Sequence, residues 1–289
     1  MSTRSPGPSQ AASADAGKGC VAILLASVWS AGNIVHPGVL RRLREQGIDV
    51  QLFVRGGSTS SAFPDAAGCH PFLRVAQVSG PLARLAGAVT ARAFGRRNRV
   101  KSYRIYRRWR ERRASLVRRI EDGCLEVLAT LAQPTACFER LRRYSGVLDS
   151  RAADLQAVRV QLRAVAPDLI WSVGGVVRQR DRSYVLAARD LGIPVAASIQ
   201  NLDTLTSYFI SATYDHYLVW SQTMRDRLLR LYPHVGSTRV TIAGAPRFDL
   251  HRQSSRFRSR RETLSGFGMP PDAHYYLYAT SVSALAPDE

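Results

Sequence analysis

Between residues 167 and 246 the chain alternates short apolar runs with helical patterns, and this alternation limits the possible folds more than any other feature. The runs PDLIWSV, IPVAASI, HYLVWS and RVTIAG each look like a strand, whereas SYVLAARDLG and QTMRDRLLRLY place apolar residues at helical spacing. Short continuous apolar runs are typical of parallel strands that are covered on both faces. Strands alternating with helices therefore predict an α/β fold, a doubly wound parallel sheet.

The first part of the chain has the same pattern. VAILLAS predicts a strand, residues 33–47 a helix that stops at Gly47, and IDVQLFV a second strand. Residues 56–90 contain many glycines and prolines, which predicts loops with weak strands. We expect a long helical region over 91–131, broken near Asp122-Gly123, and a helix over about 150–165 that starts near Ser150. A helix ending at Gly266 or Gly268 and a strand in HYYLYATS complete the pattern.

The pattern predicts three parts. Residues 1–18 are small and polar and predict a disordered tail. Residues 19–250 form the main α/β domain, with a basic helical insertion at about 91–131. We expect residues 251–289 to be a linker helix and the first strand of a second α/β domain that is cut short.

Charge and cysteine content narrow the function only a little. The formal net charge is +19, which suits a polyanionic partner, but nearly all basic residues are arginine, a bias that genome base composition also produces. The four cysteines form no C-x-x-C pair, so we expect no structural zinc and free, mostly buried thiols in a reducing compartment. Cys69-His70 is either half of a metal site or a chance pair. No apolar run reaches the roughly 18 residues that span a bilayer.

A polar cluster directly follows the run IPVAASI. It consists of Gln200, Asn201, Asp203, Thr204, Thr206 and Ser207. Ligands of doubly wound sheets bind beyond the carboxyl ends of the strands, where this cluster lies. The alternative is that these residues cap a helix, although capping needs only one or two of them. The pair Gly174-Gly175 follows another strand and suits close approach of the backbone to a ligand.

Three segments carry a resemblance to a known family. SIQNLDTLTS, DHYLVWSQTMRDRLLRLY and VTIAGAPRFD are similar to bacterial surface-polysaccharide glycosyltransferase-like proteins of the GT-B fold, which build capsule and cell-envelope glycans. These are related to nucleotide-sugar epimerases and glycerophosphotransferases. GNIVHPGVLRRLREQGIDVQLFV resembles the GT-B opening, and YATSVSALAPDE resembles the phosphate-side loop of the second domain. The resemblance implies a Rossmann-like, acceptor-binding N-terminal domain.

The resemblance also implies a reaction, the transfer of a sugar from a nucleotide-activated donor to a glycan or lipid-linked acceptor. It makes Asp203 and His36 candidates for the catalytic base or for orienting the acceptor. It implies no metal and no cofactor besides the nucleotide-sugar. Residues implied to bind substrate are Asn33, Gly174, Gly175, Asn201, Thr204, Thr206 and Ser207, and those implied to contact donor phosphate are Thr280 and Ser281.

Several of these residues also have plain structural explanations. His36 precedes Pro37 and would then cap the first helix, and Thr280 and Ser281 would be turn residues. Asp249, in the Gly-x-Pro-x-Phe-Asp turn, would be the N-cap of the next helix.

Residues 92–120 hold thirteen basic residues and one acid, Glu111, with Tyr103, Tyr106 and Trp109 at three-residue spacing. Basic residues beside an aromatic stripe suit an anionic membrane surface. The alternative is a solvated helix whose aromatic residues pack on the core. We expect a cytoplasmic protein, peripheral on the inner membrane face, and no nucleic-acid partner because no such motif occurs. The residues expected to contact the membrane are Arg96, Arg97, Arg99, Lys101, Arg104, Arg107, Arg108 and Trp109.

Two other functions remain open from the sequence. One is a nucleotide-sugar epimerase, although the six histidines are few for its acid and base chemistry. The other is a non-catalytic basic module that binds membranes or nucleic acid.

Overall fold

The structure is a computed structural model, and it describes ten stretches of the chain. These are residues 19–25, 38–54, 66–73, 80–100, 115–152, 155–174, 181–201, 204–207, 209–252 and 257–276. The chain divides into two compact units, Met1–Arg247 and Phe248–Glu289. The expectations of a disordered tail at 1–18 and of a strand continuing past Tyr276 lie outside the described residues, and His274, Tyr275 and Tyr276 are in no strand.

The first unit is built on a seven-stranded parallel sheet, which confirms the predicted doubly wound α/β fold. The strand order is β3-β2-β1-β4-β5-β6-β7. The strands β2 and β3 therefore extend the sheet on one side of β1, and β4 to β7 extend it on the other side. This is a Rossmann-like arrangement. The strands are β1 (Cys20–Leu25), β2 (Asp49–Val54), β3 (Gly68–Pro71), β4 (Leu169–Val173), β5 (Val195–Ser198), β6 (His216–Val219) and β7 (Val240–Ile242).

Both faces of the sheet are apolar because alternate residues of each strand point to opposite sides. Ala22 and Leu24 of β1 belong to the larger core cluster, whereas Ile23 and Leu25 belong to the smaller one. Leu40, from α2 (Val39–Glu45), packs into the smaller cluster. This explains why the strands read as continuous apolar runs in the sequence.

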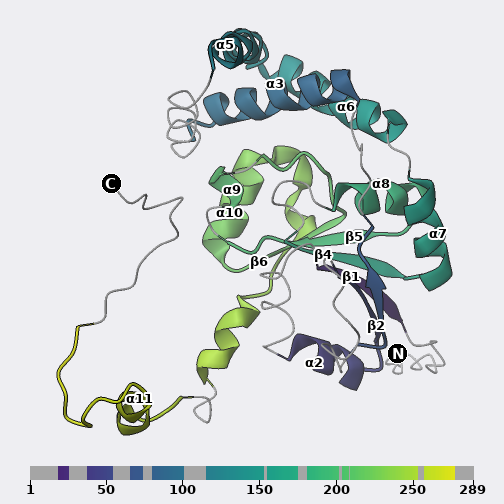
Figure 1. Cartoon of the computed structure of the whole chain (residues 1–289). Coiled ribbons are helices and arrows are strands. Elements are labelled where there is room, and N and C mark those ends of the chain that lie inside the picture. The colour runs from purple at the N-terminus through teal and green to yellow at the C-terminus, as the bar shows by residue number, and fades with distance from the viewer. Residues whose placement is uncertain are drawn as a thin grey trace, which may run out of the picture. The chain divides into compact units, whose positions relative to one another are not determined.

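Helices cover the larger core cluster in two layers. Figure 1 shows α8 and α10 on one side of the sheet, α2 on the other, and α3, α5 and α6 beyond the α8 and α10 layer. The described helices of this unit besides α2 are α3 (Pro81–Arg97), α5 (Leu116–Leu131), α6 (Thr135–Ala152), α7 (Gln156–Val165), α8 (Arg182–Asp190), α9 (Thr204–Ser207) and α10 (Gln222–Leu231). Short 3₁₀ turns follow at Pro233–Val235, Ser237–Arg239 and Pro246–Arg252.

An aromatic cluster attaches the outer helices to the rest of the unit. Phe94 of α3 lies 5.1 Å, between ring centroids, from both Phe209 and Tyr232, and Phe138 of α6 lies 6.2 Å from Phe209. Phe94, Phe138 and Tyr232 are buried. Because aromatic side chains bury large apolar areas, this cluster holds the outer layer in place.

The helical insertion differs from the sequence expectation. The helix α3 begins at Pro81, inside the stretch expected to be loops, because proline is well suited to the first turn of a helix. The expected break at Asp122-Gly123 is wrong, since α5 runs through both residues. Asp122 forms an ion pair with Arg92 of α3, and this packing outweighs the roughly 1 kcal/mol that glycine costs in a helix. Ser150 lies inside α6, and the next helix starts at Gln156.

The second unit contains one described helix, α11 (Arg260–Gly266). Ser259 caps it reciprocally: Ser259 Oγ accepts from the Glu262 N–H at 3.2 Å, and Glu262 Oε2 accepts from the Ser259 N–H at 2.7 Å. Arg260 lies over the ring of Tyr275. The helix ends at Gly266, one of the two glycines expected from the sequence. Asp249 lies inside the 3₁₀ turn Pro246–Arg252, in its first turn. In neither unit is a described helix long and apolar enough to cross a bilayer.

Candidate functional site

The candidate site is a cavity of about 110 Å³ at the carboxyl ends of β4, β5 and β6. We call it the carboxyl-edge pocket. Its volume is below the roughly 300–1,000 Å³ of pockets that enclose drug-sized ligands, so it suits a small polar group or one edge of a larger ligand. It is lined by Trp171, Val173, Ser198, Gln200, Leu218, Trp220, Ala243, Gly244, Pro246 and Arg247.

The sheet register brings this lining together. Val173 pairs with Ser198, and Ser198 with Leu218, so these three side chains point to the same face of neighbouring strands. Trp171 lies two residues before Val173 and shares that face. Its indole N–H donates to Ser198 Oγ at 2.8 Å, which fixes the ring against the next strand.

Gln200 supplies a free donor to the pocket. Its Nε2 is buried, and within the described part of the chain it donates to no protein acceptor. The preceding residue, Ile199, extends the ladder by donating its N–H to the Leu218 carbonyl at 2.9 Å, so Gln200 is held at the edge of the sheet. A buried donor without a partner costs about 1–3 kcal/mol, and such a group indicates a missing ligand or water.

Arg247 supplies the positive charge of the pocket. Its guanidinium Cζ lies 4.7 Å from the centroid of the Trp220 ring, which is a cation–π geometry. Gly244 follows β7 and has φ of 73°, a conformation in which glycine makes a tight turn without strain. After this turn the chain lines the pocket with Arg247. None of the described lining residues carries a carboxylate or an imidazole. The pocket therefore favours neutral or anionic ligands.

The polar cluster after β5 is divided by the structure. The Asn201 carbonyl accepts the Thr204 N–H at 3.2 Å, and Thr204 is buried beside Leu205. Thr204 thus lies in the core at the start of α9 and does not line the carboxyl-edge pocket. Thr206 and Ser207 are in α9, but their side chains are outside the described structure, as is Asp203.

Gly174 directly follows β4 and has φ of 79°, a left-handed conformation that glycine adopts without strain. Gly174 is not among the lining residues of the carboxyl-edge pocket, and the expected close approach of the backbone to a ligand stays a prediction. The remaining residues expected at the site, His36, Asn33, Gly175, Thr280 and Ser281, lie outside the described residues.

Three of the basic residues expected to contact a membrane are described, and they differ in environment. Arg96 is paired within the protein: its Nε lies 2.7 Å from Glu126 Oε2, and its Nη1 donates to Thr130 at 2.9 Å. Arg97 and Arg99 are exposed, and the Arg97 guanidinium lies over Phe138. The others, Lys101, Arg104, Arg107, Arg108 and Trp109, are outside the described residues.

A buried polar network lies beneath the start of α8. Asp181 is fully buried, and its Oδ2 accepts hydrogen bonds from Ser172 Oγ and, at 3.0 Å, from the Tyr214 hydroxyl. Burial raises the pKa of the Asp181 carboxyl, although these hydrogen bonds oppose the shift. Burial also lowers the pKa of the neighbouring Arg182 to about 10, so the guanidinium stays charged at neutral pH. Asp181 lines neither of the two cavities described here, so we assign this network to the scaffold.

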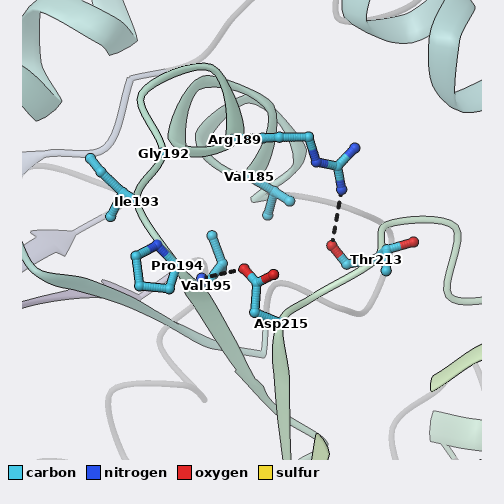
Figure 2. Close-up of a pocket in the computed structure, with 8 residues that line it drawn as sticks. All are labelled: Val185, Arg189, Gly192, Ile193, Pro194, Val195, Thr213 and Asp215. Carbon is cyan, nitrogen blue, oxygen red and sulfur yellow. Dashed lines mark hydrogen bonds between the residues drawn. The ribbon is translucent and has the colours of Figure 1, made fainter. Parts of the chain in front are cut away.

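A larger cavity, of about 270 Å³, lies at the opposite edge of the sheet, where β5 begins and α8 ends (Figure 2). Its polar groups are already used within the protein. Arg189 donates to the Thr213 carbonyl at 3.2 Å, and Asp215 Oδ2 accepts the Val195 N–H at 2.9 Å. Because ligands of doubly wound sheets bind at the carboxyl edge, we prefer the smaller pocket despite its size.

The cysteines are free, as predicted, but the expectation that most are buried is wrong. Cys124 and Cys137 are exposed on α5 and α6, and Cys20 and Cys69 are half-buried. His70, next to Cys69, donates a hydrogen bond from Nε2 to Gln51 Oε1 at 2.9 Å and stacks on Phe53. Among the described residues there is no group of three or more potential metal ligands.

The residue pattern after β5 predicts the location of the site but not most of the residues that line it. Trp171, Ser198, Trp220 and Arg247 were not proposed, and Gln200 was noted only as part of the polar cluster. The signal in the sequence is a tryptophan within β4, Trp171, and another directly after β6, Trp220. No protein-family model matches the chain, and no curated protein sequence matches it.

Proposed function

We propose that the carboxyl-edge pocket binds a saccharide acceptor, and that the chain takes part in glycosyl transfer from a nucleotide-activated donor to a glycan or lipid-linked acceptor. The observation that carries the proposal is the buried Nε2 of Gln200, a pocket-lining residue; this nitrogen has no protein acceptor in the part of the chain that the structure describes. A sugar hydroxyl is a neutral acceptor of matching size. Trp171 and Trp220 offer apolar ring surface, and Arg247 places a guanidinium group in the wall, a lining that suits a polyhydroxylated ring.

The reaction follows from this assignment. The acceptor hydroxyl attacks the anomeric carbon of the donor sugar as the bond from that carbon to the nucleotide diphosphate breaks. The diphosphate leaves with the bonding electrons, and a base takes the hydroxyl proton. Asp203, next to the pocket residues in sequence, and His36 are our candidates for that base. The Rossmann-like sheet and the similarity of SIQNLDTLTS and VTIAGAPRFD to GT-B glycosyltransferases support the proposal.

A titration of the chain with oligosaccharides and, separately, with nucleotide-sugars tests the assignment. We expect oligosaccharide to change the tryptophan fluorescence, because two of the four tryptophans line the pocket. Gln200→Ala removes one hydrogen bond and should weaken binding about fivefold. Gln222→Ala removes an exposed amide from the start of α10 and is the matched control.

Circular dichroism and a second variant, Gln200→Leu, separate loss of the donor from misfolding. If no oligosaccharide binds, or if both Gln200 variants bind as tightly as the unaltered chain, the acceptor assignment is wrong. Gln200-dependent binding of a nucleotide-sugar alone would also overturn it, because the pocket would then be the donor site.

A further inference from the structure

The helix α5 exposes a continuous apolar face. Six of its large apolar residues are between 43% and 73% exposed, and the exposed Cys124 lies among them, whereas Leu125 packs against the larger core cluster. At 3.6 residues per turn, all of these exposed residues fall within about 120° of the helix circumference, which makes one unbroken stripe. We call it the α5 stripe: Leu116, Val117, Ile120, Cys124, Val127, Leu128 and Leu131.

The other side of α5 carries the polar contacts, which is the reverse of an ordinary surface helix. Asp122 and Glu126 face α3, where Arg92 Nη2 lies 2.7 Å from Asp122 Oδ1 and Arg96 Nε lies 2.7 Å from Glu126 Oε2. Ala129 is buried on this same side. These ion pairs fix which face of α5 turns inward, so the stripe must point away from α3.

A stripe of this kind marks an interaction surface. Single exposed apolar residues are common, but a contiguous exposed apolar patch on a protein indicates a partner or a membrane. The helix has 16 residues and is therefore about 24 Å long, enough to lie along a lipid interface but too short to cross a bilayer. Within the described structure no other element covers the α5 stripe.

The charge around the stripe selects among possible partners. The described residues of α3, α5 and α6, with their adjoining turns, contain eleven basic side chains and five acidic ones. Three of those acids, Asp122, Glu126 and Glu139, already pair with arginines of the same helices. Among the described side chains of these helices and turns, the exposed arginines are Arg84, Arg97, Arg99, Arg119, Arg140 and Arg143.

We propose that α5 docks on an anionic lipid bilayer, with its stripe inserted at the level of the acyl-chain boundary and the surrounding arginines on the headgroups. Apolar insertion and arginine–phosphate attraction are the two contributions that hold interfacial helices on anionic membranes. A second copy of the chain is a poorer occupant, because it would bring the same positive charge to the contact. This inference does not depend on the proposed transfer reaction.

Flotation of the full chain with vesicles tests the proposal. We expect binding to vesicles with about 30% phosphatidylglycerol, and much weaker binding to pure phosphatidylcholine or at about 0.5 M salt. Val127→Gln should lower the vesicle partition coefficient about fivefold, and Ile120→Gln/Val127→Gln/Leu131→Gln about a hundredfold. Val160→Gln, at a valine of similar exposure on α7, should leave binding unchanged.

Cys124 offers a second readout of depth. A polarity-sensitive dye attached to it in a Cys137→Ser chain should shift to shorter wavelength on anionic vesicles, since the thiol lies within the α5 stripe. The half-buried Cys20 and Cys69 should react more slowly, because burial raises the pKa of both thiols.

The outcomes separate the possible occupants. Binding that the glutamine variants leave unchanged would mean that arginines alone hold the chain on lipid, and would overturn the role of α5. The lipid assignment would be overturned if the chain does not bind vesicles but forms a dimer through the α5 stripe. Sedimentation would then show a dimer for the unaltered chain and a monomer for the triple glutamine variant. A chain that binds anionic vesicles but no saccharide would leave this inference standing and remove only the proposed function.

Discussion

Trp171 donates its indole N–H to Ser198 Oγ at 2.8 Å, so that a side-chain hydrogen bond joins the carboxyl ends of β4 and β5 at the wall of the carboxyl-edge pocket. The bond matters because Trp171 is partly buried and its N–H has no other acceptor among the described residues. The pocket wall is therefore held by a contact between side chains 27 residues apart in sequence.

Ser198→Ala tests that contact. It leaves the indole N–H without its acceptor and should lower the free energy of unfolding by about 1–2 kcal/mol. Urea unfolding measures the change in the free energy of unfolding. The indole ring of Trp171 should also become more mobile, which lowers the tryptophan fluorescence anisotropy. Ser237→Ala, at an exposed serine, is the control and should change stability by less than about 0.5 kcal/mol. Equal effects of the two substitutions would show that the hydrogen bond contributes nothing.

The pairing of α3 with α5 should show as coupling between Arg92 and Asp122. Their side chains are 13% and 15% exposed, so removing either leaves a poorly solvated charge. A double-mutant cycle with Arg92→Met and Asp122→Asn should give a coupling energy of about 1–2 kcal/mol in urea unfolding.

The matched comparison is the Arg41–Glu45 pair of α2, whose side chains are 65% and 64% exposed. The same cycle there should give less than about 0.5 kcal/mol, because solvent screens the exposed pair. A coupling for Arg92–Asp122 as small as that of the exposed pair would remove the argument that these charges orient α5.

Two glycines predict opposite effects of the same substitution. Gly123 lies within α5 with open space around the position of an added Cβ, so Gly123→Ala should raise the free energy of unfolding by about 0.5–1 kcal/mol. Gly192, just after α8, also has open space but a φ of 70°, so Gly192→Ala should lower it by about 1 kcal/mol. Thermal or urea unfolding measures both, and a shift of the same sign in both would contradict the backbone argument.

The sheet could be predicted from the sequence because its strands are buried on both faces, and continuous apolar runs such as VAILL and IPVAAS record that burial directly. The insertion could not be predicted in the same detail. Proline and glycine generally disfavour helices, yet Pro81 begins α3. Gly123 lies within α5, a helix that is stabilised by its ion pairs with α3. Those contacts are tertiary, so local sequence does not reveal them.

The same reason limits prediction of the site. The polar loop after β5 follows from strand order alone, and Gln200 belongs to it. Trp171, Trp220 and Arg247 come from separate segments, and only the register of β4, β5 and β6 and the turn at Gly244 bring them to one cavity. The outward apolar face of α5 was equally hidden, because a helical pattern indicates an apolar face but not which way it points.

The buried carboxyl of Asp181 predicts a pH dependence of stability. Burial raises the pKa of Asp181 in the folded state above its ordinary value of 3.8, so the folded chain binds this proton more tightly than the unfolded chain. The stabilisation from the neutral acid is complete below about pH 3.8 and is lost as pH rises through the raised pKa. The Asp181→Asn variant cannot ionise at this position. Its free energy of unfolding, relative to that of the unaltered chain, should therefore increase as the pH rises above about 3.8.

Urea unfolding of both chains at about pH 4 and about pH 8 measures this difference. Asp226→Asn, at an exposed carboxylate on α10, is the control, and its stability should run parallel to that of the unaltered chain. The hydrogen bonds from Ser172 and Tyr214 oppose the effect of burial, because they favour the charged carboxylate. If the Asn variant instead loses stability relative to the unaltered chain as the pH rises, these hydrogen bonds outweigh burial, and Asp181 is an ionised anchor of the network.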